Sequence, residues 1–241
     1  MELIPLKTPL IKPKDDLLEI FEIALKKARK IPCDDDIWVI SSKVVALMQN
    51  RVVTLSNQLT EADISKKEAD IWLGGKPYPF AVKDGILTPR AGIDASNIEA
   101  GKRILWPKNS WKVAEILRKA VMQRWKLKNF GVEIIDSTCH PLRWGVIGIA
   151  LGWSGFEGVE DFRNRKDLFG NNLKVTRKAV ADQLASAASL ITGEAAESTP
   201  FVLVRNAPVK FTTKTVKPRK FQPKDCLFAP IYNSKFRNLK I

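Results

Sequence analysis

Residues 131–152 read GVEIIDSTCHPLRWGVIGIALG, and this stretch decides the fold class. Two short apolar runs, 132–135 and 145–152, lie on either side of a polar turn. Runs of this length that are rich in Val and Ile predict buried strands, the first of them ending on Asp136. The glycines of the second run do not fit the spacing G-x-G-x-x-G. They indicate a strand that bends or packs closely rather than a dinucleotide-binding loop.

Helical and strand patterns alternate on both sides of this stretch. Apolar residues at helical spacing predict helices over residues 16–30, 61–72 and 110–128, and a long helix that is capped by Thr176 and ends at Gly193. Shorter apolar runs predict strands over residues 37–41, 43–47, 51–55 and 201–204, and a hairpin over residues 80–88 around Asp84-Gly85. Mixed elements of this kind predict an α/β or α+β fold.

The composition is that of a globular protein with a strongly basic surface. Of 241 residues, 45% are hydrophobic and 27% are charged, and 40 Lys and Arg against 26 Asp and Glu give a formal net charge of +14. A domain this basic favours polyanionic partners such as nucleotides, polycarboxylates or nucleic acid. No apolar run has the length needed to cross a bilayer, and the N-terminus lacks a signal-peptide pattern, so we expect neither a membrane span nor export.

The histidine and cysteine counts exclude several kinds of functional site. The single histidine, His140, excludes zinc sites with several histidine ligands and proton relays between two histidines. The three cysteines form no C-x-x-C pair, which argues against a disulfide framework and favours a reducing, cytoplasmic compartment. Carboxylates at the ends of predicted elements are therefore the main candidates for a functional site.

One such candidate is the loop AGIDASN, residues 91–97, after a predicted strand. The carboxylate of Asp94 suits a hard metal ion, and the amide of Asn97 suits a phosphate or a base. The alternative is an Asx turn, in which Asp94 and Ser96 cap local backbone amides.

A second candidate is Asp136-Ser137, at the carboxyl end of the predicted strand 132–135. A carboxylate followed by a hydroxyl at this position suits Mg²⁺ or Mn²⁺, and the alternative is a helix or turn cap. Further along, Arg163 and Arg165 stand in a cluster of alternating charges. Their guanidinium groups suit carboxylates or phosphates, and the alternative is a solvated network of ion pairs.

Four ordered blocks of sequence resemble the coenzyme F-420-0:L-glutamate ligase family. They are AGIDASNIEAG at 91–101, IIDSTCHPLRWGVIGIALGWSG at 134–155, DFRNRKDLFGNNLKVTRKAVADQLASAASLITGEA at 161–195 and PFVLVRN at 200–206. The N-terminal PLIKPKDDL and DIWVISSKVV also look like the opening of that family. The resemblance covers most of residues 1–206 and leaves 207–241 as a basic C-terminal extension. It implies a two-part α/β fold with interleaved subdomains that forms an intertwined homodimer.

The resemblance also implies which residues form the site. By position, the family's metal-side residues are matched by Asp94, Asp136, Ser137 and Glu194. Its nucleotide-contacting positions are matched by Leu10, Ile11, Ser42, Lys43 and Asn97. The candidate substrate contacts are Arg143, where relatives have a basic pair, together with Arg163 and Arg165.

The activity that the resemblance implies is a γ-glutamyl ligase that uses GTP or ATP with Mg²⁺ or Mn²⁺. Such an enzyme would join L-glutamate to an anionic cofactor that carries a carboxyl group, either the F-420 precursor or a folate. Ligation through an acyl phosphate depends on positioning and metal charge more than on a histidine base, so the single histidine is no obstacle.

Two departures from the family pattern keep alternatives open. Leu47 stands where relatives carry a nucleotide-contacting lysine, and Cys139-His140-Pro141 stands where relatives carry Gly-Arg-Pro. The change at Leu47 motivates the alternative of a non-catalytic homologue that holds a nucleotide or cofactor. Nucleic-acid binding through the basic segment 210–240 is a weaker hypothesis.

Overall fold

The computed structural model describes residues 1–214, 221, 225–228 and 230, and the chain divides into two compact units. The first unit contains residues 1–51 and 107–214. The second contains residues 52–106 together with the described residues from 221 onward. Most of the predicted basic extension, 207–241, lies outside the described residues. The mixed α/β fold that the sequence predicts is confirmed in both units.

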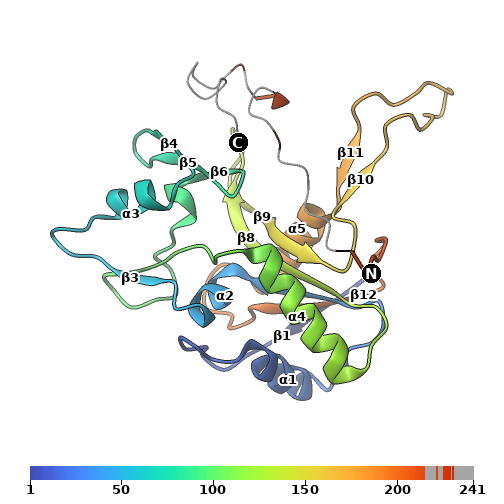
Figure 1. Cartoon of the computed structure of the whole chain (residues 1–241), viewed down its shortest axis with the longest axis horizontal. Helices are drawn as coiled ribbons and strands as arrows, with labels where there is room; N and C mark the ends of the chain where they lie inside the picture. Colours follow the sequence, from blue (N-terminus) through green and yellow to red (C-terminus); the bar gives the residue numbers. More distant parts are fainter. Residues whose placement is uncertain (215–220, 222–224, 229, 231–241) are drawn as a thin grey trace. The chain divides into compact units, whose positions relative to one another are not determined.

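The first unit is built on a five-stranded sheet (Figure 1). In spatial order its strands are β1 (Glu2–Leu6), β12 (Phe201–Arg205), β2 (Ile37–Ser41), β8 (Gly131–Cys139) and β9 (Val146–Ser154). β2 and β8 pair in parallel, and the other neighbours are antiparallel. Strands β1, β2 and β8 therefore run in one direction, and their carboxyl ends meet at one edge of the sheet.

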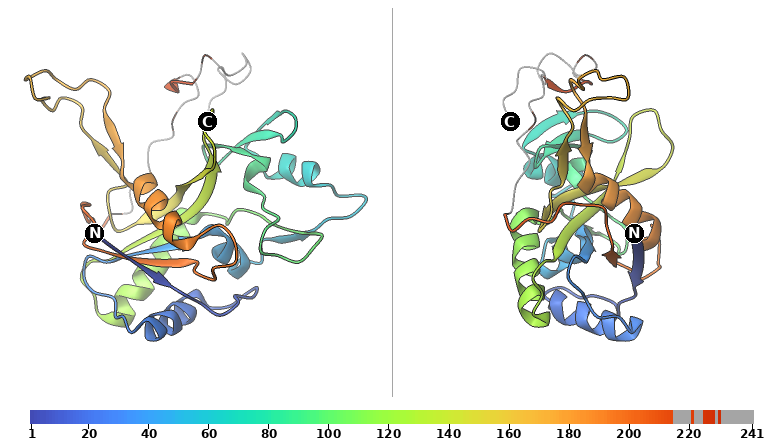
Figure 2. Two further views of the ribbon diagram at one scale, coloured as in Figure 1. Left: turned by 180° about the vertical axis from the view of Figure 1, so that it is seen from behind. Right: turned by 90° about the vertical axis from the view of Figure 1, so that its right-hand side faces the viewer.

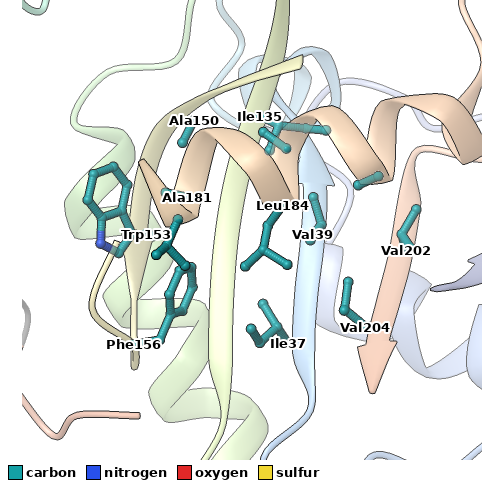
Figure 3. Close-up of a cluster of buried hydrophobic side chains, with 13 residues drawn as sticks. Ile37, Val39, Ile135, Ala150, Trp153, Phe156, Ala181, Leu184, Val202 and Val204 are labelled. Carbon is teal, nitrogen blue, oxygen red and sulfur yellow. The ribbon is translucent and has the colours of Figure 1, made fainter. Parts of the chain in front are cut away.

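Helices cover both faces of this sheet (Figure 2). Helix α5 (Val180–Thr192) packs on one face, over the apolar cluster that Figure 3 shows. Helices α1 (Leu17–Ala28), α2 (Ser42–Met48) and α4 (Ser110–Trp125) pack on the other face. On that face the Phe21 and Trp38 rings stack with centroids 3.8 Å apart. Burial of both faces explains why β2 and β12 are almost continuously apolar.

The second unit contains two smaller sheets. One pairs β3 (Val52–Thr54) with β7 (Lys102–Ile104), and the other consists of β4 (Ile71–Gly74), β5 (Phe80–Lys83) and β6 (Ile86–Pro89). Helix α3 (Glu61–Glu68) and the 3₁₀ turn η1 (Arg90–Gly92) accompany them. Its core is formed by Ile64, Ile93 and Leu105. The hairpin predicted around Asp84-Gly85 is confirmed.

A two-stranded arm leaves the sheet of the first unit between β9 and α5. It pairs β10 (Val159–Asp161) with β11 (Arg177–Ala179), and the long loop 162–176 joins the two strands (Figure 1). Three large apolar side chains of this loop, Leu168, Phe169 and Val175, are exposed. No helix among the described residues is both long and apolar enough to span a membrane.

Three predicted elements are wrong in type or extent. Residues 43–47 belong to helix α2 and not to a strand, because a five-residue apolar run has no decisive period and packing overrides the strand propensity of valine. The helix predicted over 61–72 ends at Glu68, and β4 follows, since Asp70 N already donates to Val82 O of the neighbouring strand. Thr176 does not cap α5, because 177–179 pair with β10 first.

An ion pair ties the end of β12 to the start of β2. The carboxylate of Asp36 is buried and accepts hydrogen bonds from Arg205 Nε at 2.9 Å and Nη2 at 2.8 Å, and from Cys33 N at 2.8 Å. We expect Arg205→Ala to lower the free energy of unfolding by about 1.5–3 kcal/mol, since it leaves a buried carboxylate without its cation. Urea unfolding measures the loss.

Arg124→Ala is the matched control for this prediction. Arg124 of α4 donates to Glu22 of α1, in a pair in which the arginine side chain is 57% exposed. Because exposed ion pairs contribute little, we expect a loss below about 1 kcal/mol. Equal losses for the two variants would contradict the special role of Asp36.

Candidate functional site

The carboxyl edge of the first unit's sheet brings several predicted site residues together. Ser41 is in register with Ile135 across the parallel pair β2–β8. Ser42 and Lys43 therefore follow β2 at the same edge at which Asp136 and Ser137 continue β8. In open sheets with parallel strands, this edge is where ligands bind. Ser42 is buried, whereas Lys43, Asp136 and Ser137 are partly exposed.

Backbone hydrogen bonds bring two further segments to this edge. Thr8 N donates to Ser198 O at 3.0 Å, and Ser41 N donates to Pro200 O at 2.9 Å. The first bond ties the chain after β1, which leads to Leu10 and Ile11, to the segment 194–200 that precedes β12. Leu10 is exposed and Ile11 is buried.

Glu194 enters the same segment from helix α5. Gly193, with φ of +72°, caps the helix as predicted, and its N–H donates to Ser189 O. Glu194 is exposed immediately after this cap. The edge thus gathers, from the first unit, Leu10, Ile11, Ser42, Lys43, Asp136, Ser137 and Glu194.

Strand β8 does not end at Asp136, as the sequence predicts, but continues to Cys139 in a hairpin with β9. Only the parallel pairing with β2 stops at Ile135. Because side chains alternate along a strand, Asp136 and Ser137 point to opposite faces. Ser137 is opposite Gly148, where an added Cβ would lie 2.3 Å from Ala185 O of α5, so Ser137 lies on the α5 face.

The tip of the β8–β9 hairpin presents exposed side chains. His140, Leu142, Arg143 and Trp144 all lie there, and Leu142 and Trp144 have relative exposures of 105% and 104%. An indole and a guanidinium group at adjacent, exposed positions can contact a flat anionic molecule by stacking and by ion pairing.

Asp94 and Asn97 belong to the second unit and are described within it. Asp94 forms a backbone bridge with Ile104, and its Oδ1 accepts a hydrogen bond from Ser96 N at 2.6 Å. The Asx turn that the sequence allowed as an alternative is therefore present. It holds the Asp94 carboxylate in a defined orientation at the head of an exposed loop that contains Asn97.

The turn before Asp94 is held by buried contacts. Arg90, Ala91 and Gly92 all have positive φ values, and a Cβ on Gly92 would lie 2.2 Å from the Trp106 ring. Arg90 donates to Glu61 at 3.1 Å, and Arg103 donates to the other oxygen of the same carboxylate. Although burial raises the pKa of Glu61, these two hydrogen bonds outweigh it and lower the pKa. Glu61 therefore stays ionised and keeps the turn in place.

Arg163 and Arg165 lie on the arm, where they pair with acids of the arm itself. Arg163 Nη2 donates to Asp161 at 2.6 Å, and Arg165 Nη2 donates to Glu160 at 3.2 Å. The hydrogen bonds from Arg163 hold the pKa of Asp161 well below its usual range. Both arginine side chains are nearly half exposed, so the geometry matches the solvated ion-pair network that the sequence allowed as an alternative.

The donor chemistry of the sheet edge suits a hard divalent cation. Asp136, Ser137 and Glu194 offer carboxylate and hydroxyl oxygens, which Mg²⁺ and Mn²⁺ prefer. Among the residues that the structure describes, no group of three or more His, Cys, Asp or Glu side chains lies close enough to hold a metal ion. A site at this edge therefore depends on serine, on phosphate oxygens or on water besides the acids.

Two acids between the sheet and α5, the buried Glu133 of β8 and Asp182 of α5, did not emerge from the sequence as candidates. Glu133 is fully buried in β8, and Asp182 Oδ1 accepts a hydrogen bond from Ala150 N at 3.1 Å. Burial, and then the charge of Asp182, raise the pKa of Glu133 well above its usual value. A glutamate inside an otherwise apolar strand was the sequence signal for this feature.

A comparison with protein families identifies the chain. The family model described as F420-0:Gamma-glutamyl ligase matches residues 5–206. The chain belongs to this family. The match confirms the resemblance carried by the four sequence blocks, and it spans the sheet edge of the first unit as well as the loop that contains Asp94.

Individual members of the F420-0:gamma-glutamyl ligase family match over most of the chain. A coenzyme F420:L-glutamate ligase of Methanocaldococcus jannaschii is 45% identical over 196 residues, with 81% of this chain and 77% of that protein covered. The protein of that name from Methanococcus maripaludis strain S2 is 36% identical, with 90% and 92% covered. That from Archaeoglobus fulgidus is 33% identical, with 87% and 89% covered.

Proposed function

We propose that this protein is a γ-glutamyl ligase that joins L-glutamate to the carboxyl group of a deazaflavin cofactor precursor of the F420 type. The proposal rests on one observation above all: the family match spans residues 5–206 and includes every predicted metal-side and nucleotide-side residue. The relatives bear the name coenzyme F420:L-glutamate ligase, which favours a deazaflavin acceptor over the folate that the sequence also allowed.

The reaction we propose proceeds through an acyl phosphate. A carboxylate oxygen of the acceptor attacks the γ-phosphorus of GTP, and GDP leaves with the electron pair of the broken P–O bond. The amine of glutamate then attacks the acyl carbon, loses a proton and displaces inorganic phosphate. Both steps move negative charge between phosphate oxygens, so cations and fixed donors supply most of the stabilisation.

The residues at the sheet edge have different roles in the proposed reaction. The ammonium group of Lys43 pairs with phosphate oxygens, and the backbone around Leu10 and Ile11 borders the nucleotide. Ser137 and Glu194 on the α5 side of the sheet, and Asp136 on the opposite face of β8, would offer oxygen ligands to Mg²⁺ or Mn²⁺. When bound, such an ion neutralises phosphate charge and aligns the γ-phosphoryl group. The net charge of +14 attracts GTP and the anionic acceptor to the protein.

The exposed arm supports a homodimer as the functional form. Leu168, Phe169 and Val175 of its loop would lie in water in a monomer, although large apolar side chains are normally covered. An arm that extends away from the sheet suits an exchange of contacts with a second copy of the chain (Figure 1). We therefore propose an intertwined dimer built through residues 162–176.

Trp144 is the proposed contact for the acceptor ring. We expect Trp144→Ala to raise KM for the deazaflavin acceptor about 3- to 10-fold, because an aromatic pair contributes about 0.5–1.5 kcal/mol. KM for GTP should stay unchanged. Leu142→Ala is the matched control, since Leu142 is equally exposed on the same tip and has no ring. Equal effects of the two substitutions on KM would argue against stacking.

The full-length protein tests the function directly. It is incubated with Mn²⁺ or Mg²⁺, with GTP or ATP, with L-glutamate and with either the F420 precursor or a folate. Mass spectrometry then measures addition of a glutamyl residue, and phosphate release measures turnover. We expect glutamylation of the deazaflavin, dependent on metal and nucleotide.

The other outcomes separate the alternatives. Glutamylation of a folate alone would keep the reaction and change the acceptor. Saturable nucleotide binding without hydrolysis or glutamyl transfer would favour the non-catalytic homologue that Leu47 suggests, and would overturn the ligase proposal.

A further inference from the structure

Helix α5 is anchored to β9 at the segment that pairs with Asp136 and Ser137. Asp182 Oδ1 accepts a hydrogen bond from Ala150 N at 3.1 Å, and Ser186 Oγ donates to Gly148 O at 2.9 Å. Between these two bonds, the absence of a Cβ on Gly148 lets the helix backbone at Ala185 approach the strand. Figure 3 shows Ala150, Ala181 and Leu184 between the helix and the sheet.

The anchor lies on an irregularity of the β8–β9 ladder. Gly152 pairs with Ile134, but the next residue of β8, Ile135, pairs with Ala150, so Leu151 is an extra residue in β9. A bulge of this kind leaves a backbone group without its ladder partner. The N–H of Ala150 finds its acceptor in the carboxylate of Asp182, which satisfies a donor that would otherwise be buried and unpaired.

The bulge sets the register of the next rungs. Because of the extra residue, Gly148 faces α5 and is paired with Ser137, whereas Ile149 is paired with Asp136 and faces away. Without the extra residue Leu151, Ile149 would take the place of Gly148 and face Ala185, where not even a Cβ fits. The residue that lies opposite Ser137 on the α5 face, Gly148, is thus set by the same contacts that hold the helix.

Helix α5 also carries Glu194, one residue beyond its cap at Gly193. A single anchor can therefore place a donor from the strand and a donor from the helix end. We infer that Asp182 and Ser186 are positioning residues for the metal-side donors Ser137 and Glu194. This inference rests on the proposed function, which assigns a divalent cation to these donors.

Titration with Mn²⁺ alone, followed by electron paramagnetic resonance, tests the inference on the full-length protein. We expect Asp182→Leu to raise the Kd for Mn²⁺ about 10- to 100-fold, the usual effect of removing a group that orients metal ligands. Asp182→Asn should stay within about threefold of the unchanged protein, because its amide oxygen can still accept from Ala150 N.

Ser186→Ala and Ser189→Ala form a matched pair on the same helix. The Ser186 hydroxyl reaches the strand, whereas the Ser189 hydroxyl donates to Ser186 O within the helix at 2.9 Å. We expect a weaker Mn²⁺ affinity only for Ser186→Ala. This pair decides the matter if Asp182→Leu fails to fold. Equal affinities for Asp182→Leu and the unchanged protein, equally weak binding for the leucine and asparagine variants, or indistinguishable serine variants would overturn the inference.

The two proposals fail in distinguishable ways. If the unchanged protein binds Mn²⁺ and responds to the Asp182 variants but adds no glutamate to any acceptor, the ligase proposal fails and the positioning role stands. If ligation occurs and KM for Mn²⁺ is unchanged in Asp182→Leu, the positioning role fails and the ligase proposal stands. A protein that binds no Mn²⁺ overturns the positioning role as well as the metal site.

Discussion

Asp136→Asn is expected to reduce kcat/KM for glutamyl transfer by about 10³-fold or more. A divalent cation contributes several kcal/mol to a phosphoryl transfer, and each 1.36 kcal/mol corresponds to about a tenfold change in rate. Asparagine keeps the size of the side chain and removes the charge that the cation needs. A coupled assay of phosphate release measures the rate, and Mn²⁺ paramagnetic resonance measures metal affinity in the same variant.

Folding should be unaffected by this substitution. Asp136 is only partly buried and lies beyond the last parallel pair of the sheet. Glu22→Gln is the control, because it also changes a carboxylate to an amide, at a partly exposed position of α1. We expect this control to keep its activity within about twofold, as surface substitutions usually do. An Asp136→Asn variant with full activity would remove the metal-side assignment.

Glu133→Leu is expected to stabilise the protein. Glu133 is fully buried between Val39 and Trp153 in the sheet, and neither of its carboxyl oxygens has a hydrogen-bond partner among the described residues. A buried polar group without a partner costs about 1–3 kcal/mol, and leucine has a similar volume without polar atoms. We expect the free energy of unfolding to rise by about 2–4 kcal/mol at pH 8.

The gain in the free energy of unfolding that we expect for Glu133→Leu should depend on pH. Burial, and then the charge of Asp182, raise the pKa of Glu133 in the folded protein well above the value of 4.5 in the unfolded chain. As the pH rises from about 4.5 towards the folded pKa, the unfolded chain releases this proton and the folded protein keeps it, so stability falls. Glu133→Leu abolishes that fall, and its advantage should be smaller at pH 4 than at pH 8.

Two further variants isolate the cause. The glutamine in Glu133→Gln cannot ionise but remains polar. This variant should therefore remove the pH dependence, with a smaller gain in the free energy of unfolding at pH 4 than Glu133→Leu gives. Glu115→Gln on α4 is the control at a partly exposed position, since hydrogen bonds from Lys119 and Lys112 lower the pKa of Glu115 rather than raise it. Thermal unfolding at several pH values measures all three variants. A loss of stability in Glu133→Leu at pH 8 would mean that the carboxyl group has a partner in the folded protein.

Long elements with a clear period were predictable from the sequence. The helices α1 and α4 and the strands β2 and β12 follow from apolar spacing, and the cap at Gly193 follows from residue type. Helix α2 was missed because Val44 and Val45 prefer strands in isolation. Thr176 was misplaced as a cap because the pairing of β11 with β10, 16–20 positions earlier in the chain, determines where α5 begins.

The sequence by itself determined the family, through four ordered blocks, and the residue types available for metal and phosphate chemistry. Only the tertiary structure decided that the chain after β1, the start of α2, the middle of β8 and the end of α5 share one edge of a sheet. Strand order and direction decide that edge, and they depend on pairing between distant segments. The bulge at Leu151 was likewise beyond local patterns, because it arises from how β9 pairs with β8 and contacts α5.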